Sequence, residues 1–383
     1  MQINYGKHYI DSEDIKSVKK QLKSSNLTQG KTVQKFEKEL KNRFRAKYCV
    51  ATSSGTGSLH LISLAYGWKK NDIIFTSPLS FVATSNCILY SGAKPVFIDI
   101  DPKTQNIDIN LLEKKIISLK KSKKKMKAII AVDYAGHPND WKSLYKIKKK
   151  YGLKLINDNC HALGASYYTK YYAAKYADCI NLSFHAVKNI TTGEGGAILT
   201  NDKSLFKYAS LLKTHGIQKF NKENKAMWFY DMKYLGFNYR ITDIQCALGI
   251  SQLKKLTKFI NKRRKIARVY NEAFKDDPRF ILPIEKKNIK HAYHLYPLQI
   301  KFENLKISKT NFFKKMLKQN IRLQVHYIPI HLHSYYKKKF GYKVGDFPIC
   351  ENFYKREVSL PIYYSLKTSQ QSKIINLIKK FSK

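Results

Sequence analysis

Three stretches of the sequence hold residues whose types could do chemistry together. Residues 53–57, SSGTG, stand between an extended run and an apolar helix, where free backbone N–H groups can hold a phosphate. Asp158 ends an apolar run, and a carboxylate at a strand end can pair with a cationic ring nitrogen. Lys188 lies in a loop after Ser183, and a lysine whose amine is partly desolvated can form a Schiff base.

Each stretch alone also has a purely structural explanation. SSGTG is neither GxGxxG nor GxxxxGK[ST], and it equally suits a simple turn between a strand and a helix. Asp158 could cap the next helix, and a lone loop lysine such as Lys188 is more often a surface residue. The chemical interpretation therefore depends on the fold that positions these stretches.

Short apolar runs alternate with helical stretches from residue 48 onward. The runs are YCVAT, DIIFTS, PVFIDI, AIIAVDY, KLIND, CINLSF and AILTN. Parallel strands need crossovers of a dozen or more residues, which are usually helices. The pattern predicts one large α/β domain over 30–250 with a mainly parallel sheet, and ligands bind such sheets at the carboxyl ends of the strands.

The two ends of the chain lack this alternation of short apolar runs and helices. Residues 1–29 form an N-terminal segment with an amphipathic helix after Asp11, and we expect it to pack near the small domain and the candidate site. A long helix over 241–274 leads into residues 251–383, which we predict to be a smaller α+β domain. That domain ends in a helix over 368–381.

The composition is strongly basic, with 72 Lys and Arg against 27 Asp and Glu and a formal net charge of +45. Such a field attracts polyanions, but only nine of the basic residues are arginine, so we expect no nucleic-acid binding and assign the lysines to solvated faces. Six scattered cysteines predict no metal site and a reducing compartment. No signal peptide or apolar span is evident, so we expect a cytoplasmic protein without a membrane partner.

Taken in order, a phosphate cup, a strand-end aspartate, a serine and a loop lysine match the cofactor site of fold-type I pyridoxal-phosphate enzymes. Longer motifs resemble the DegT/StrS family of sugar aminotransferases over nearly the whole chain. They include NLTQGK, SSGTGSLHL, TSPLSFVATSNCILYSGAKPVFIDID, VDYAGHP, NDNCHALGA, SFHAVKNITTGEGGAILT, LGFNYRITDIQCALGISQL, HLYP and VHYIPIH. The resemblance implies an aspartate aminotransferase-like fold, with a mainly parallel seven-stranded sheet and a smaller α+β C-terminal domain.

LTQGK, SFHAVKNITT and QVHYIPI are most similar to members of the pseudaminic acid pathway. Those enzymes convert a UDP-4-keto-6-deoxy-N-acetylhexosamine into UDP-4-amino-4,6-dideoxy-N-acetyl-β-L-altrosamine, with L-glutamate as the expected amino donor. Relatives that act on other nucleotide-linked keto sugars share most of the motifs, so another 4-keto or 3-keto sugar is the alternative substrate.

The resemblance also implies a set of residues that bind pyridoxal 5′-phosphate. Lys188 would hold the cofactor covalently and carry the proton, and Asp158 would pair with the ring nitrogen. The phosphate would be bound by Gly55, Thr56 and Ser183. Phe81 would lie against the ring, His161 would support it, and Asn238 would reach it from a neighbouring subunit of a homodimer with shared active sites. Considered singly, Phe81 suits a core, His161 a helix and Asn238 a turn.

For the substrate, the resemblance points to residues near both ends of the chain. These are Tyr5, Ser25, Asn26, Leu27, Thr28, His326, Tyr327, Ile328, Pro329 and Tyr336. Tyr336 could instead cover a face of the small domain, and the VHYIPIH stretch could be an edge strand that its proline ends.

Two positions depart from the family pattern, and three other functions compete with transamination. Asn157 stands where many relatives carry glutamate, which leaves the tuning of Asp158 open, and Gly57 stands where many carry alanine. The chain could be a non-catalytic regulator with the same fold, or a basic nucleic-acid or membrane-surface protein. A dehydratase of this superfamily would carry histidine in place of Lys188, so the lysine favours a transaminase.

Overall fold

The computed structural model describes residues 2–121, 125–219, 226 and 228–382. Its largest sheet has seven strands in the order β2-β9-β8-β6-β5-β3-β4, and β9 is antiparallel to both of its neighbours while the remaining pairs are parallel. The strands are β2 (Tyr48–Thr52), β3 (Asp72–Thr76), β4 (Lys94–Phe97), β5 (Lys125–Val132), β6 (Lys154–Asp158), β8 (Cys179–Ser183) and β9 (Gly196–Thr200). The prediction of a mainly parallel seven-stranded sheet is confirmed.

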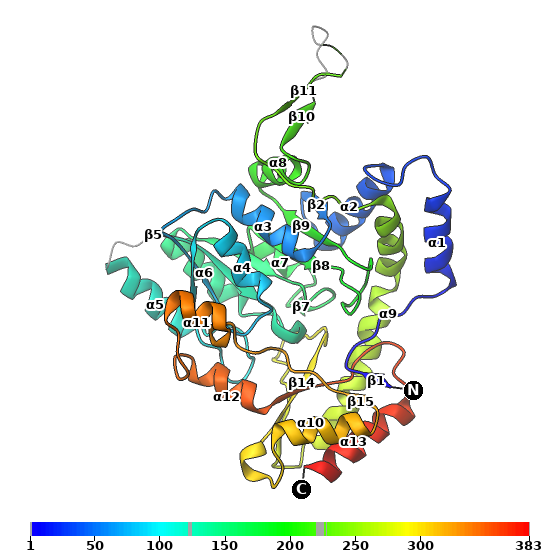
Figure 1. Cartoon of the computed structure of the whole chain (residues 1–383), viewed down its shortest axis with the longest axis vertical. Helices are drawn as coiled ribbons and strands as arrows, with labels where there is room; N and C mark the ends of the chain where they lie inside the picture. Colours follow the sequence, from blue (N-terminus) through cyan, green and yellow to red (C-terminus); the bar gives the residue numbers. More distant parts are fainter. Residues whose placement is uncertain (1, 122–124, 220–225, 227, 383) are drawn as a thin grey trace.

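Helices cover both faces of this sheet because its strands are apolar on both sides (Figure 1). Along β3, Ile73 and Phe75 pack into one hydrophobic cluster, whereas Ile74 between them packs into the other. The helices of the two layers are α2 (Lys31–Phe44), α3 (Gly55–Ala65), α4 (Ala83–Tyr90), α5 (Ile109–Lys121), α6 (Trp141–Tyr151), α7 (Tyr172–Tyr176), α8 (Lys203–Leu212) and α9 (Asp243–Phe274).

A second core lies around the C-terminal half of α9. A three-stranded antiparallel sheet, ordered β12-β14-β16, packs there with α10 and α13 (Figure 1). The short strand β1 near the N-terminus pairs in parallel with β15, so the two ends of the chain share this region. The elements of this region are β1 (Ile3–Asn4), β12 (Phe280–Ile281), β14 (Tyr296–Ile300), α10 (Lys309–Lys318), β15 (Ile321–Arg322), β16 (Glu357–Leu360) and α13 (Thr368–Phe381), whereas α1 (Ser12–Leu22) packs against the N-terminal half of α9.

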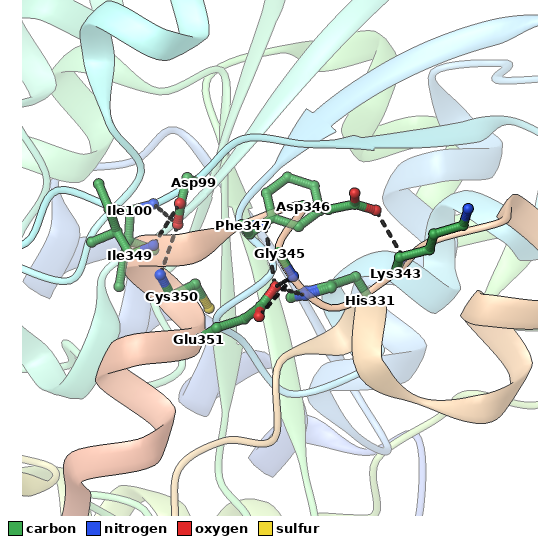
Figure 2. A network of polar contacts seen from close by, with 10 residues as sticks. All are labelled: Asp99, Ile100, His331, Lys343, Gly345, Asp346, Phe347, Ile349, Cys350 and Glu351. Atoms are coloured by element: carbon green, nitrogen blue, oxygen red, sulfur yellow. Dashed lines mark hydrogen bonds and ion pairs between the residues drawn. The ribbon is translucent and has the colours of Figure 1, made fainter. Parts of the chain in front are cut away.

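Two helices beyond residue 330 pack against residues at the strand ends of the large sheet. Figure 2 shows the Asp99 carboxylate, which follows β4, accepting from the backbone N–H groups of Ile349 and Cys350, both at 2.9 Å. These donors begin α12, where the first N–H groups of a helix have no partner within the helix. The segment comprises η3 (Ile330–Leu332), α11 (Ser334–Phe340) and α12 (Pro348–Arg356).

The remaining short elements are two strand pairs and two turns of 3₁₀-helix. One pair forms a hairpin that projects from the large domain (Figure 1). They are β7 (Ser166–Tyr167), which pairs with β13 (Ile289–Lys290), the hairpin β10 (Ile217–Lys219) and β11 (Tyr230–Met232), η1 (Tyr134–Gly136) and η2 (Phe302–Asn304). Within the described residues no helix is long and apolar enough to cross a membrane.

The start of α2 is held by a residue from the start of α9. The Asp243 carboxylate accepts from the backbone N–H groups of Gly30 at 2.7 Å, Thr32 at 3.0 Å and Val33 at 3.1 Å. Gly30 is the N-cap of α2 and has no side chain that could cap the helix. A Cβ atom at Gly30 would lie 2.9 Å from Asp243 Oδ1, so the glycine permits this close approach.

We predict that Asp243→Ala lowers the free energy of unfolding by about 2–3 kcal/mol, because it removes a buried carboxylate that accepts from three backbone donors at the start of α2. Asp243→Asn is the matched control and should cost less, because one acceptor oxygen remains. Urea unfolding followed by circular dichroism measures both variants. Equal midpoints for Asp243→Ala and the parent chain would show that this contact does not stabilise the fold.

Candidate active site

A cavity of about 400 Å³ lies where the carboxyl ends of β6 and β8 meet the N-terminus of α3. The three stretches that the sequence singled out therefore come together, as expected for an open α/β sheet. Of the predicted site residues, the cavity is lined by Tyr5, Gly55, Thr56, Phe81, Asp158, His161, Ser183, Lys188, His326 and Tyr327.

Asp158 is the buried carboxylate of this cavity, with only 3 % of its surface exposed. Its Oδ2 accepts from Thr84 Oγ1 of α4 at 2.7 Å, and its Oδ1 accepts from Asn181 Nδ2 of β8 at 3.2 Å. Because Thr84 donates to Asp158, the 2.7 Å contact between Thr84 and Ser80 must have Ser80 as the donor. These donors hold the carboxylate in place, while an ionised carboxylate retains lone pairs for a further donor in the cavity.

The N-terminus of α3 forms the side of the cavity that could bind a phosphate. Ser54 caps the helix, with its Oγ accepting from Gly57 N at 3.0 Å. A Cβ atom at Gly55 would lie 2.9 Å from Ser183 Cβ, and one at Gly196 would lie 2.4 Å from the Ser54 carbonyl carbon. The two glycines therefore let β8 and β9 approach the start of α3, which places Ser183 beside its free N–H groups.

Lys188 lines the cavity beside Asp158 and Cys160. Burial lowers the pKa of the Lys188 amine from its ordinary value of 10.5, and the nearby Cys160 and Asp158 act in the opposite direction. Burial dominates because the charged ammonium loses water here, so the amine is neutral at a lower pH than that of an exposed lysine. A neutral amine is the form that acts as a nucleophile or accepts a proton.

Three histidines around Lys188 are held neutral. Burial lowers the pKa of His161 and of His294 well below the usual 6.5, and the positive charge of Lys188 adds to the effect. Burial, with Lys188, lowers the pKa of His326 to about 3. His161 Nε2 lies 3.0 Å from the Tyr327 hydroxyl, and its ring centre lies 4.5 Å from that of His294.

Phe81 and Tyr5 lie at other parts of the cavity wall. The Phe81 side chain is 56 % exposed, with its ring centre 6.0 Å from that of Tyr327. Tyr5 lies with its ring centre 5.0 Å from that of His326, and its backbone carbonyl accepts from Ile362 N at 3.0 Å. The N-terminal and C-terminal segments thus contribute aromatic surface to the same cavity.

The other predicted residues do not line this cavity. Leu27 and Thr28 contact the start of α9, because Leu27 O accepts from Asp243 N at 2.9 Å and Thr28 pairs with Thr242. The remaining residues outside the cavity are Ser25, Asn26, Asn238, Ile328, Pro329 and Tyr336. Tyr336 is buried and its hydroxyl contacts Ser85 Oγ at 2.6 Å and Asn86 Oδ1 at 2.7 Å, so in this structure it packs against α4. Asn238 pairs with Thr214 beside the projecting hairpin.

Several residues of the cavity were not singled out from the sequence. Asn181 is a polar residue inside the apolar run CINLSF, and a polar side chain in such a run indicates a buried polar site. Thr84 and His294 lie within two of the quoted motifs, but their positions beside Asp158 and His161 arise only from packing between distant segments. Ser54 lies in the SSGTG stretch, and the other missed residues are Leu59, Ser80, Ala83, Val132, Cys160, His185, Val187 and Glu194.

Comparison with known proteins identifies the class to which this site belongs. The model of the DegT/DnrJ/EryC1/StrS aminotransferase family matches residues 8–379. The chain belongs to this family. It is 41% identical to the uncharacterized protein MJ1066 of Methanocaldococcus jannaschii, over 97% of this chain and 95% of that protein. It is 39% identical to the UDP-4-amino-4,6-dideoxy-N-acetyl-β-L-altrosamine transaminase of Campylobacter jejuni, over 95% of this chain and 93% of that protein.

Solved structures of the family have the same fold. Helicobacter pylori PseC, an aminotransferase involved in the biosynthesis of pseudoaminic acid, superposes with a TM-score of 0.90 at 36% identity, covering 100% of this chain and 99% of that one. The PLP form of a putative sugar aminotransferase, Spr1654 from Streptococcus pneumoniae, superposes with a TM-score of 0.90 at 26% identity, covering 100% and 99%. The predicted fold and enzyme class, an α/β transaminase, are therefore confirmed.

The side chains of the cavity fit pyridoxal phosphate, the cofactor that the family implies. The start of α3 with Ser183 offers donors for a phosphate, Asp158 offers an acceptor for a ring N–H, and Lys188 offers an amine of lowered pKa. Among the described residues, His161 Nδ1 and His294 Nδ1 are buried without a hydrogen-bond partner, so the wall of the cavity retains polar capacity. The three kinds of group that such a cofactor needs are therefore present in one cavity.

We predict that the Lys188 amine titrates below pH 10.5, because burial disfavours its charged form. Reductive methylation with formaldehyde, quantified by mass spectrometry across pH, measures this for each lysine of the cofactor-free chain. Lys150 is the internal control, since Glu113 raises its pKa. A midpoint for Lys188 at or above that of Lys150 would contradict the prediction.

Proposed function

We propose that this transaminase uses pyridoxal 5′-phosphate to move the amino group of L-glutamate to C4 of a UDP-4-keto-6-deoxy-N-acetylhexosamine. The product would be UDP-4-amino-4,6-dideoxy-N-acetyl-β-L-altrosamine. The observation that carries the cofactor assignment is the meeting of Lys188, Asp158 and the α3 N-terminus in one cavity. The C. jejuni transaminase and the H. pylori PseC structure, each covered almost completely, support the substrate.

The roles of the residues that would hold the cofactor follow from their positions in the cavity. Gly55, Thr56 and Ser183 bind the phosphate, and Asp158 accepts a hydrogen bond from the ring nitrogen and keeps it protonated. When bound, pyridoxal phosphate would supply an aldehyde carbon that carries the amino group between the two substrates and a ring that withdraws electrons from it. Lys188, as a neutral amine, binds the cofactor and then moves a proton at the carbon that gains or loses nitrogen.

The aromatic wall excludes water and orients the substrates. Phe81 lies at the rim, where it can cover the cofactor ring, and His161 is held by the Tyr327 hydroxyl at 3.0 Å. The neutral histidines add no positive charge that would compete with Lys188 for Asp158. The sugar would lie against Tyr5 and the His326–Tyr327 segment, which face the cavity from the other ends of the chain.

Further parts of the proposal concern assembly and location. We infer a homodimer in which Asn238 of one subunit reaches the phosphate of the other, because Asn238 does not line the cavity of its own chain. In such a dimer Ser25, Asn26, Leu27, Thr28, Ile328, Pro329 and Tyr336 would bind the nucleotide or shape its site. We also propose that the enzyme is cytoplasmic, where UDP-sugars and glutamate are available, and that it is organised as an N-terminal segment 1–29 and domains 30–250 and 251–383.

We predict that Lys188→Ala lowers the rate of amino transfer by about 1,000-fold or more, because the nucleophile and proton carrier are lost. Purified protein reconstituted with pyridoxal phosphate should be yellow, and borohydride should attach the cofactor to Lys188 in a tryptic peptide. Lys150→Ala, at an exposed lysine, is the control and should keep both properties. Attachment at another lysine, or a colourless reconstituted protein, would reject the cofactor assignment.

We predict that the UDP-4-keto-6-deoxy-N-acetylhexosamine is turned over with the highest kcat/KM in a panel of nucleotide-linked 4-keto and 3-keto sugars. Glutamate is the donor, and the amino sugar is identified by mass spectrometry and NMR. Spectral conversion of the bound cofactor by glutamate alone separates an enzyme from a non-catalytic regulator. A higher kcat/KM for another nucleotide sugar would replace the proposed substrate and leave the transaminase assignment intact.

A further inference from the structure

His326 presents one ring nitrogen to the cavity and the other to a buried polar chain. Its Nδ1 lies 2.8 Å from Ser359 Oγ, and Ser359 Oγ donates to Glu357 Oε1 at 2.5 Å. His326 lines the cavity with 6 % of its surface exposed, and Nε2 is not among the buried unpaired atoms of the described residues. Nε2 is therefore the nitrogen that a ligand in the cavity can reach.

The direction of the hydrogen bonds follows from the number of protons. An ionised glutamate only accepts, and a serine hydroxyl has one proton to give. When Ser359 gives that proton to Glu357, it can only accept from His326, so the proton of the imidazole must lie on Nδ1. A neutral imidazole with its proton on Nδ1 has a lone pair on Nε2.

Glu357 also accepts from a second donor, and the direction of this hydrogen bond is fixed. Its Oε2 accepts from the backbone N–H of His326 at 2.9 Å, and a backbone N–H can never act as an acceptor. Glu357 and Ser359 belong to β16, which lies in the antiparallel sheet of the second core, and both residues are fully buried. Two of the three members of this hydrogen-bonded chain, Glu357 and Ser359, are thus held in a buried strand.

We propose that Glu357 and Ser359 are positioning residues that hold His326 in the Nδ1–H tautomer, so that its Nε2 accepts a hydrogen bond from a hydroxyl or amide N–H of the keto sugar. The inference about the ligand rests on the proposed function, whereas the tautomer is a property of the protein alone. An N-acetylated sugar carries both a hydroxyl and an amide N–H. The lone pair on Nε2 can accept from these two donors, whereas a keto oxygen and an ionised phosphate have no proton to donate to it.

The groups around His326 and Glu357 keep the imidazole neutral and the carboxylate charged. His326 stays neutral because burial, with Lys188, lowers its pKa to about 3. Burial raises the pKa of Glu357 to about 7, while the ammonium of Lys309 favours the charged form. Tyr134 and Tyr327 also face this carboxylate, and both are neutral phenols whose pKa burial raises. Glu357 is therefore an acceptor at pH values above about 7, where the tautomer should be measured.

Glutamine has almost the same shape as glutamate. Replacing Glu357 by glutamine therefore reverses the direction of the hydrogen bonds between residue 357, Ser359 and His326 and leaves the geometry unchanged. The backbone N–H of His326 needs an acceptor, so the amide oxygen of Glu357→Gln must face it, and the amide NH₂ must face Ser359. Ser359 then accepts from the amide and donates to His326 Nδ1, which moves the imidazole proton to Nε2. The cavity would lose an acceptor and gain a donor at the same atom.

Two further variants separate this effect from a general loss of structure. Ser359→Ala removes the hydroxyl that couples Glu357 to His326, so both tautomers should appear. Glu351→Gln is the matched control, because Glu351 is also a buried glutamate that accepts from a histidine, His331 Nε2 at 3.0 Å, and from backbone N–H groups. Its network joins α12 to η3 and to the residues just before α12, and its members His331, Gly345 and Phe347 do not line the cavity (Figure 2).

The test measures ¹⁵N-histidine-labelled holoenzyme by long-range ¹H–¹⁵N NMR above pH 7, with the His326 signals assigned by their loss in His326→Asn. The expected result is an Nδ1–H tautomer in the parent and in Glu351→Gln, and an Nε2–H tautomer in Glu357→Gln. Half-reactions followed by the cofactor spectrum give the second readout. Glu357→Gln should raise the keto-sugar concentration for half-maximal conversion roughly 10- to 100-fold.

The proposal is overturned if the parent enzyme holds the Nε2–H tautomer, or if Glu357→Gln retains the proton on Nδ1. It is also overturned if the tautomer moves and binding of the keto sugar does not weaken. A parent enzyme that converts glutamate but no UDP-keto sugar would reject the proposed substrate instead, and the tautomer measurement would still decide the role of Glu357 and Ser359.

Discussion

The charge balance between Lys188 and Asp158 constrains the whole cavity. The Lys188 amine and the buried Asp158 carboxylate lie beside His161, His294 and His326, which burial holds neutral, so these three imidazoles add no charge that competes with either group. If these histidines were charged, they would compete with Lys188 for the Asp158 carboxylate and lower the pKa of the lysine amine further. The pKa of the Lys188 amine therefore depends on burial of these imidazoles as well as on its own burial.

The position of Asp158 depends in turn on a second buried carboxylate, Asp133, at the end of β5. Asp133 Oδ2 accepts from Asn157 and Asn159, each at 3.2 Å, and from the Tyr172 hydroxyl at 2.7 Å. The two residues that flank Asp158 are therefore tied to the neighbouring strand, while Asp158 points to the cavity. This explains why asparagine suits position 157 here. A glutamate would place a second negative charge against Asp133, whose pKa burial already raises to about 6.

The fold and the centre of the site could be predicted because they depend on local patterns. Apolar runs marked the strands of the large sheet, and polar or small residues where those runs end, such as Asp158, Ser183 and Gly55, marked its functional edge. Thr84, His294 and the Glu357–Ser359 pair could not be found this way. Their contacts join segments that are far apart in the sequence, and the side-chain pattern of a short helix or strand does not reveal what packs against it.

The pair His326–Tyr327 shows how a strongly constrained segment links the two halves of the site. Tyr327 contacts His161 on the side of the proposed cofactor, whereas His326 contacts Ser359 on the side of the second core. The segment that follows is fastened to the large domain at two further places, where Tyr336 reaches α4 and Asp99 caps α12. With both its ends fixed, the segment can hold an acceptor for the sugar at a constant place relative to Lys188. Precise placement of this kind favours reaction over mere binding, because the reacting atoms must meet in a narrow range of geometries.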